Sequence, residues 1–241
     1  MSSPCSRAVG RPTLGRMDSV RENICRVREK MEQAAVRAGR SADAITLLAV
    51  TKALAPEWIE EAIAAGIPTF GESKVQEARQ KISLVSGRAR WHMIGHLQTN
   101  KAPDAIELFE LIHSVDSVKL AGELNKWAER AGKTQRILLE VNVSGEASKF
   151  GLKPDALEST LERTNAMPRL EVQGLMTVAP FGQDKQKARP YFRQLHELGE
   201  RFALKEFSMG MSHDFEVAIE EGATLVRIGT AIFGERMKAE G

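Results

Sequence analysis

The stretch ITLLAVTK, residues 45–52, places a lysine directly after a continuous apolar, β-favouring run. Runs of this length that are bounded by polar residues are typical of strands buried on both faces in a parallel sheet. An amine at the end of such a strand, partly removed from water, is a nucleophile suited to attack a carbonyl. Lys52 is therefore a candidate functional residue, and the alternative is that it merely begins a solvated loop.

Length and charge narrow the possible classes of protein. The chain has 241 residues, 34 basic and 32 acidic, with a formal net charge of +2, and this length suits one large α/β domain. Because the charges are interspersed, we expect neither nucleic acid nor a membrane as a partner. The two cysteines, Cys5 and Cys25, are too few for a disulfide framework or a thiolate zinc site, so we expect a cytoplasmic protein.

The chain is predicted to divide into a tail and one domain. Residues 1–17 carry Arg7, Arg11 and Arg16 among serine, proline and glycine, which predicts a disordered tail or, alternatively, a transit peptide. From Asp18, apolar residues recur at helical spacing up to Gly39, which predicts an extra helix before the first strand. The domain is predicted to span residues 18–241.

Beyond Lys52, short apolar runs alternate with helix-compatible segments. The pattern predicts strands over residues 45–52, 67–70, 91–94, 111–113, 136–143, 170–176, 207–209 and 224–228. It predicts helices over residues 56–65, 73–84, 98–107, 118–131, 154–164, 187–202 and 214–221, with a last turn near Phe233. Eight such units indicate a single closed (β/α)8 TIM barrel of the α/β class. An open doubly wound sheet is the alternative, but residues 52–56 lack its Gly-rich loop.

In a barrel of this kind, chemistry collects at the carboxyl ends of the strands. The polar and chemically versatile residues predicted there are Lys52, residues 71–73, His92, His96, Asn142, Met176, residues 208–213 and residues 227–230. Barrels often hold a phosphate on backbone N–H groups between the loops after the seventh and eighth strands. Ser212, Gly229 and Thr230 suit such a cradle.

A phosphate cradle opposite a strand-end lysine fits a cofactor with a phosphate at one end and an aldehyde at the other. Pyridoxal 5′-phosphate (PLP) has this form, and Lys52 would hold it as a Schiff base. Arg227 would donate to the pyridine nitrogen and keep it unprotonated, because a guanidinium does not release its proton at ordinary pH. The alternative for Arg227 is a surface pair with a carboxylate such as Glu221.

Several collinear segments carry a family resemblance: LLAVTKA, FGESKVQEA, WHMIGHLQTNK, EVNVSGEASKFG, GLMTVAP and SMGMSHDFEVAIEEGATLVRIGTAIFG. Together they resemble the pyridoxal phosphate homeostasis protein family, which has the fold-type III barrel of the alanine racemase N-terminal domain. The resemblance implies Lys52 as the Schiff-base residue, Ser212, Gly229 and Thr230 at the phosphate, Arg227 at the ring nitrogen, and Asn142, Met176, Met209 and His92 along the ring. Ser73 stands where the family usually has asparagine, which puts that contact in doubt.

The sequence favours a carrier of PLP over an enzyme. Racemization needs an acid/base group on each face of the substrate, and the single tyrosine, Tyr191, is predicted on a helix away from the mouth. We expect a monomer that buffers PLP and passes it to apo-enzymes through transient contacts. A PLP-dependent racemase or lyase, with His92, His96 or His213 as the second base, is one alternative. A phosphosugar-binding barrel is another.

Overall fold

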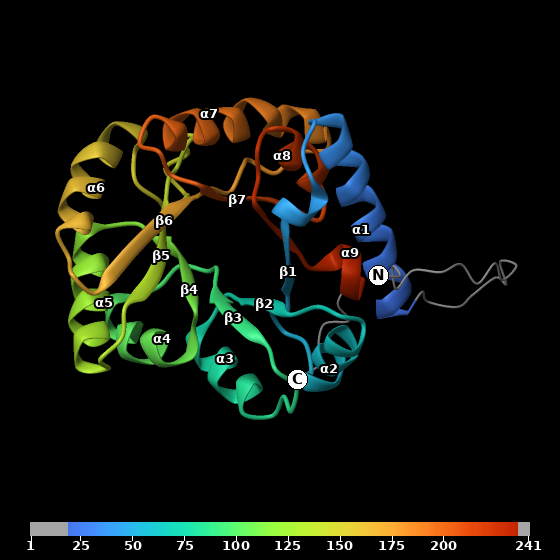
Figure 1. Ribbon diagram of the computed structural model, residues 1–241, viewed down its shortest axis with the longest axis horizontal. Helices are drawn as coiled ribbons and strands as arrows, with labels where there is room; N and C mark the ends of the chain where they lie inside the picture. Colours follow the sequence, from blue (N-terminus) through green and yellow to red (C-terminus); the bar gives the residue numbers. More distant parts are fainter. Residues whose placement is uncertain (1–18, 236–241) are drawn as a thin grey trace, which may run out of the picture.

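Eight parallel strands close into a barrel in the order of the sequence, and β1 pairs with β8 to complete the ring. The computed structural model describes residues 19–235 (Figure 1). The strands are β1 (Thr46–Val50), β2 (Thr69–Glu72), β3 (Arg90–Met93), β4 (Leu111–Val115), β5 (Gln135–Glu140), β6 (Leu170–Met176), β7 (Glu206–Met211) and β8 (Leu225–Ile228). The prediction of an α/β TIM barrel is confirmed.

Helices surround the ring of strands (Figure 1). They are α1 (Val20–Arg37), α2 (Pro56–Ala64), α3 (Val75–Ile82), α4 (Ala102–Leu108), α5 (Val118–Arg130), α6 (Leu157–Asn165), α7 (Arg189–Glu200), α8 (Phe215–Glu220) and α9 (Thr230–Phe233). Short 3₁₀ turns precede α4, α6 and α7, so three predicted helices begin with a tighter turn than we expected. Among these helices, none combines the length and the apolar character that a membrane crossing requires.

The predicted extra helix, α1, covers the seam where the barrel closes. It begins with a capping box, in which Ser19 and Glu22 satisfy each other's backbone N–H groups. Its buried face, which includes Ile24 and Met31, packs toward α2, α8 and α9 (Figure 1). Because α9 has only four residues, α1 supplies the helical cover that β8 and β1 would otherwise lack. The predicted tail, residues 1–17, lies outside the described residues.

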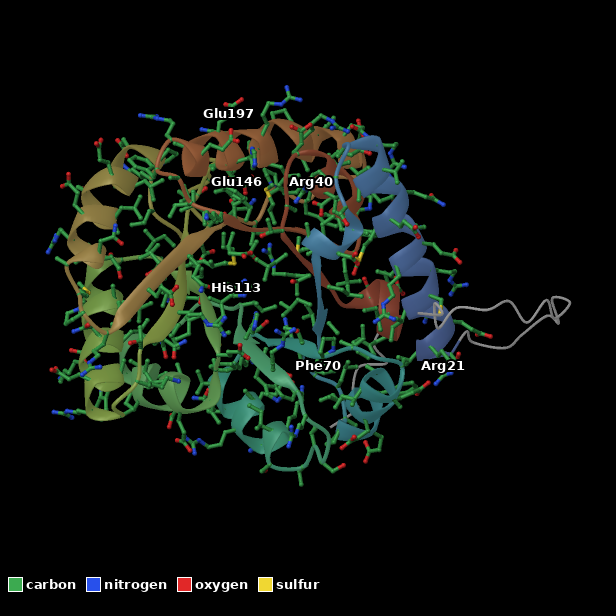
Figure 2. The ribbon with its side chains drawn as sticks, viewed as in Figure 1. Arg21, Arg40, Phe70, His113, Glu146 and Glu197 are labelled. Atoms are coloured by element: carbon green, nitrogen blue, oxygen red, sulfur yellow. The ribbon has the colours of Figure 1, made fainter. Side chains whose placement is uncertain are left out.

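Alternate residues of each strand face opposite sides of the barrel wall. Residues that face outward, such as Phe70, join the main core between strands and helices. Residues that face inward form a separate cluster of Leu111, Leu138, Met176 and Leu225. Figure 2 shows His113, two residues after Leu111, inside the ring of strands. This alternation decides which polar side chains reach the mouth.

Candidate functional site

A cavity of about 430 Å³ opens at the carboxyl ends of the strands. It is lined by Val50, Ser73, Ile94, Val178, Phe181, Met211, Ser212, His213, Asp214, Arg227, Gly229 and Thr230. The structure therefore brings together four residues that the sequence predicts for one site: Ser212, Arg227, Gly229 and Thr230. Ser73, the departure from the family pattern, lines the same cavity.

The predicted phosphate cradle has its backbone amides aimed at one point. The Ser212 hydroxyl oxygen accepts hydrogen bonds from the N–H groups of Gly229 (3.1 Å) and Ala231 (3.2 Å). Just before Ser212, the β7 register shifts between Ser208 and Met211, and Gly210 within this stretch has a φ of +89°. A Cβ at Gly210 would lie 2.5 Å from that of Ala218, so only glycine fits there. An oxygen acceptor is thus already favoured at the start of α9.

Arg227 lies in the floor of the cavity and is almost fully buried. Its guanidinium donates to the Ser208 hydroxyl (2.6 Å) and to the Thr177 carbonyl (2.8 Å). Burial lowers the pKa of Arg227 to about 10, so the group remains protonated at neutral pH. The alternative partner, Glu221, instead pairs with two arginines of α7. The surface-pair interpretation of Arg227 was therefore wrong.

A chain of buried hydrogen bonds leads from Arg227 into the barrel. Because a guanidinium only donates, Ser208 accepts from it and turns its own hydroxyl hydrogen to His113 Nδ1, at 2.8 Å. His113 then carries its proton on Nε2, which lies 3.0 Å from His92 Nδ1. Burial lowers the pKa of both imidazoles, that of His92 to about 3, so both are neutral. These linked hydrogen bonds fix the orientation of the Arg227 side chain.

Lys52 follows β1 and is exposed, unlike the partly desolvated amine that we expected. Val50, two residues earlier, lines the cavity, whereas Lys52 lies in the turn after β1 and is not one of the described lining residues. Leu48 pairs with Arg227 across the closing seam. The lysine strand is therefore beside the strand that leads into the cradle, not opposite it as we predicted, because closure of the barrel makes β1 and β8 neighbours.

A buried network holds the residues on both sides of Lys52. Thr51 donates its hydroxyl hydrogen to Glu72 Oε1 at 2.6 Å. The Lys81 ammonium of α3 lies 3.0 Å from the same oxygen and also contacts Glu77 and the Thr51 carbonyl. The Ala53 N–H donates to Glu77, and Ala53 has a left-handed φ of 56°. Nothing in the amino-acid pattern indicates this network beyond the i,i+4 spacing of Glu77 and Lys81.

Three residues predicted beside the cofactor ring are not among the residues that line the main cavity. Met209 faces outward into the main core and is fully buried, and Met211 lines the cavity instead. Met176 belongs to the inward cluster beneath the mouth, and His92 lies inside the barrel. A run of buried strand residues does not reveal which ones face inward, and the register shift in β7 adds to the ambiguity.

The side-chain amide of Asn142 is hydrogen-bonded within its own loop. Its amide nitrogen donates to the carbonyls of Glu146 (2.9 Å) and Lys149 (3.3 Å). Its oxygen accepts from the Ser144 hydroxyl and the Gly145 N–H. All four hydrogen-bonding positions of the amide are thus in use. Asn142 lines a second, smaller cavity beside the mouth rather than the one around Ser212.

The remaining candidates for a second base have other surroundings. His96 lies 3.2 Å from Asp116 and stacks on Phe150, whereas His213 is exposed at the edge of the larger cavity. Tyr191 packs on the core from α7. Within residues 19–235, no group of three histidine, cysteine or acidic residues has a geometry suited to a metal ion.

Comparison with known sequences places this chain among named relatives. The family described as "Alanine racemase, N-terminal domain" matches residues 16–237. The pyridoxal phosphate homeostasis protein of Aquifex aeolicus is 45% identical over 222 residues, which cover 89% of this chain and 97% of the relative. The human protein of the same name is 41% identical, with 87% of this chain and 84% of the relative covered.

Solved structures agree with this placement. PipY of Synechococcus elongatus, determined with PLP bound, has a TM-score of 0.80 and 33% identity, and the match covers 90% of this chain and all of that one. Alanine racemase of Streptomyces lavendulae has a TM-score of 0.70 at 21% identity, covering 89% of this chain and 56% of that one, which shows a shared fold. The chain therefore belongs to the pyridoxal phosphate homeostasis protein family, whose barrel is that of the alanine racemase N-terminal domain.

Proposed function

We propose that this chain binds PLP at the barrel mouth and takes part in intracellular PLP homeostasis, holding the cofactor and passing it to apo-enzymes. In this proposal Lys52 forms the Schiff base, and Ser212, Gly229 and Thr230 hold the phosphate. The observation that carries the proposal is the convergence of the Gly229 and Ala231 amides on one oxygen position, next to the lysine strand. The names of the relatives and the PLP-bound PipY support it.

The residues of the mouth fit PLP in size and in polarity. The cavity of about 430 Å³ lies within the range of about 300–1,000 Å³ that is usual for small-molecule sites. The Ser212 hydroxyl accepts from the Gly229 and Ala231 amides and can donate its own hydrogen to the phosphate, and buried Arg227 has N–H groups beyond the two that bond Ser208 and Thr177. Hydrophobic walls from Val50, Ile94 and Met211 suit a flat ring.

The bound cofactor would supply a reactive aldehyde, and the chain's own residues would govern it. Arg227 keeps its proton, so the ring nitrogen beside it would stay unprotonated and the ring would draw electrons weakly. The network of Thr51, Glu72 and Lys81 would fix the backbone next to Lys52. Both features suit storage of the aldehyde better than rapid chemistry on a bound amino acid.

We propose a carrier rather than an enzyme because, of the candidate second bases among the described residues, only His213 lines the cavity, and it is exposed at the cavity edge. Tyr191 packs on the core from α7, and His92 is neutral and bonded to His113 inside the barrel. His96 pairs with Asp116. The relatives are named for homeostasis, which agrees with a carrier. A monomer suffices for this function.

Absorbance of the purified protein tests the proposal. Addition of PLP should give a Schiff-base band that borohydride bleaches, and Lys52→Ala should lose it. Lys74→Ala, which removes another exposed lysine just after a barrel strand, should keep it. A wild-type protein that stays colourless with PLP would refute the proposal and favour a phosphosugar-binding barrel.

Proton exchange separates a carrier from a racemase. With alanine or serine in deuterated solvent, a carrier should exchange the α-proton no faster than free PLP does. Exchange well above that rate would establish the racemase or lyase alternative. Loss of that exchange in His213→Gln would identify the cavity-lining histidine as the base.

A further inference from the structure

A second cavity lies beside the proposed cofactor site and shares Val178 with it. Its volume is about 200 Å³, and its lining includes Glu140, Val141, Asn142, Lys149, Phe150 and Val178. This is smaller than the roughly 300–1,000 Å³ of pockets for drug-sized ligands. A ligand for it has only a few non-hydrogen atoms.

Glu140 presents a buried carboxyl to this cavity. It is 7% exposed, and its Oε2 atom has no hydrogen-bond partner among residues 19–235. Two positions after inward-facing Leu138, it also faces inward. Burial raises its pKa to about 7, Asp116 adds to this rise, and Arg227 opposes it. A carboxylate in such a place is stabilised by a cationic hydrogen-bond donor.

Lys149 brings the opposite charge to the same cavity. Its ammonium lies 3.3 Å from the Val178 carbonyl and 3.5 Å from Glu146 Oε2, which are long contacts for a charged donor. Among the described residues, no ion pair within 4.0 Å joins the Lys149 ammonium to the Glu140 carboxyl. One carboxylate and one ammonium thus line a small space without neutralising each other.

The rest of the cavity wall is apolar and held in place. Val141 and Val178 supply aliphatic surface, and Phe150 supplies a ring that is 55% exposed. The ring stacks on His96 with centroids 3.7 Å apart. Asn142 ties down the loop that carries Phe150 through its bonds to the loop backbone. A ligand could therefore enter past Phe150 and rest against a preformed wall.

We propose that this cavity binds a free α-amino acid with a small apolar side chain. Its ammonium would contact Glu140, its carboxylate would contact Lys149, and its side chain would lie against Val178 and Phe150. An anion alone would meet the buried carboxyl of Glu140, and a cation alone would leave the Lys149 ammonium with only its long contacts to Glu146 and the Val178 carbonyl. The zwitterion satisfies both charges, and this inference does not depend on PLP binding.

Titration of the Lys52→Ala protein with L-alanine tests the inference without covalent chemistry. Propionate and ethylamine are matched probes, since each lacks one charge of alanine. Chemical shifts of the Val141, Val178 and Phe150 signals in NMR spectra should move with L-alanine, and both probes should bind about tenfold more weakly or worse. Glu140→Gln and Lys149→Met should each weaken alanine binding to a similar degree. The exposed-site controls Glu158→Gln and Lys153→Met should leave it unchanged.

The pH dependence gives a second readout. Alanine binding should strengthen between pH 6 and 8 as Glu140 ionises, and Glu140→Gln should remove this dependence. The charged groups around Glu140 are Asp116, Arg227 and Lys149, with His96 acting through Asp116. His96→Gln should keep the dependence, which would exclude histidine as its source.

Three results would overturn the inference. The first is equal binding of propionate and L-alanine, and the second is alanine binding that survives Glu140→Gln. The third is an absence of shifts up to the solubility limit of alanine. The absorbance test of the wild-type protein with PLP is independent, so failure of this site and failure of the cofactor site are distinguishable.

Discussion

Glu72 and Glu140 end two strands of the same barrel and have opposite surroundings. Both carboxyls are buried, and in each the Oε2 atom lacks a hydrogen-bond partner among the described residues. Burial raises the pKa of both. Glu72 has Lys81 and Thr51 on its other oxygen, whereas the charges around Glu140 include the like charge of Asp116.

The direction of the side chain explains the difference. Glu72 is in phase with Phe70, which faces outward, and it meets a cation from helix α3. Glu140 is in phase with Leu138, which faces inward, where no helix can reach it. A buried carboxylate that faces the helices becomes part of the scaffold. One that faces the mouth remains available to a ligand.

Lys81→Met should remove the cation that compensates Glu72, and it should have the largest effect on stability of the variants considered. Removing the cation leaves Glu72 buried without compensation, which should destabilise the protein by about 3 kcal/mol at pH 8. Urea unfolding monitored by circular dichroism measures this loss. Since burial raises the folded-state pKa of Glu72 above 4.5, ionisation disfavours folding, and the loss should be smaller near pH 5.

The control for this variant is Lys81→Met combined with Glu72→Gln. The second change removes the uncompensated charge and should restore much of the stability at pH 8. If the double variant is as unstable as the single one, the network acts through packing of the lysine stem instead.

Glu140→Gln should have the opposite effect on the free energy of unfolding. Because the folded-state pKa of about 7 exceeds the unfolded value of 4.5, the neutral form is favoured in the folded protein, and wild-type stability falls as pH rises through this window. Glutamine does not ionise, so its contribution to stability does not change with pH. Relative to wild type, the variant should therefore gain about 2 kcal/mol between pH 5 and pH 8 in urea unfolding. A constant difference across this range would contradict the comparison.

Glu72→Gln should be milder than loss of the lysine. The glutamine amide oxygen would still accept from Thr51 and Lys81, and the ammonium keeps Glu77, so the cost should be about 1 kcal/mol. Thermal unfolding at pH 8 measures it. A cost as large as that of Lys81→Met would mean that the Glu72 charge itself, and not the lysine, holds the network.

Asp116→Asn should have the smallest effect, and it tests how far Asp116 raises the pKa of Glu140. Asp116 raises the pKa of Glu140, so its neutralisation should shift the titration of that carboxyl toward lower pH. Carboxyl ¹³C chemical shifts in NMR follow this titration. Glu123→Gln, a change of similar charge at a partly exposed position of α5, is the control and should leave the titration in place.

The candidate site could be predicted where it depends on the order of the chain. Ser212, Gly229 and Thr230 follow consecutive strands, so any closed barrel brings their loops together. The roles of Asn142 and Met209 could not be predicted, because they depend on a loop that uses up the amide and on the face that a buried residue takes. Their contact with the cofactor remains a prediction.

The sequence by itself determined the eight strands, the covering helix α1 and the place of Lys52 after β1, since apolar periodicity and helix signals are local in the chain. Tertiary structure alone decided that Lys81 reaches Glu72, that His113 joins Arg227 through Ser208, and that Glu140 faces a cavity. In strands buried on both faces, hydrophobicity does not distinguish inside from outside. Barrel closure and register make that choice, and with it they assign each buried charge to the scaffold or to the site.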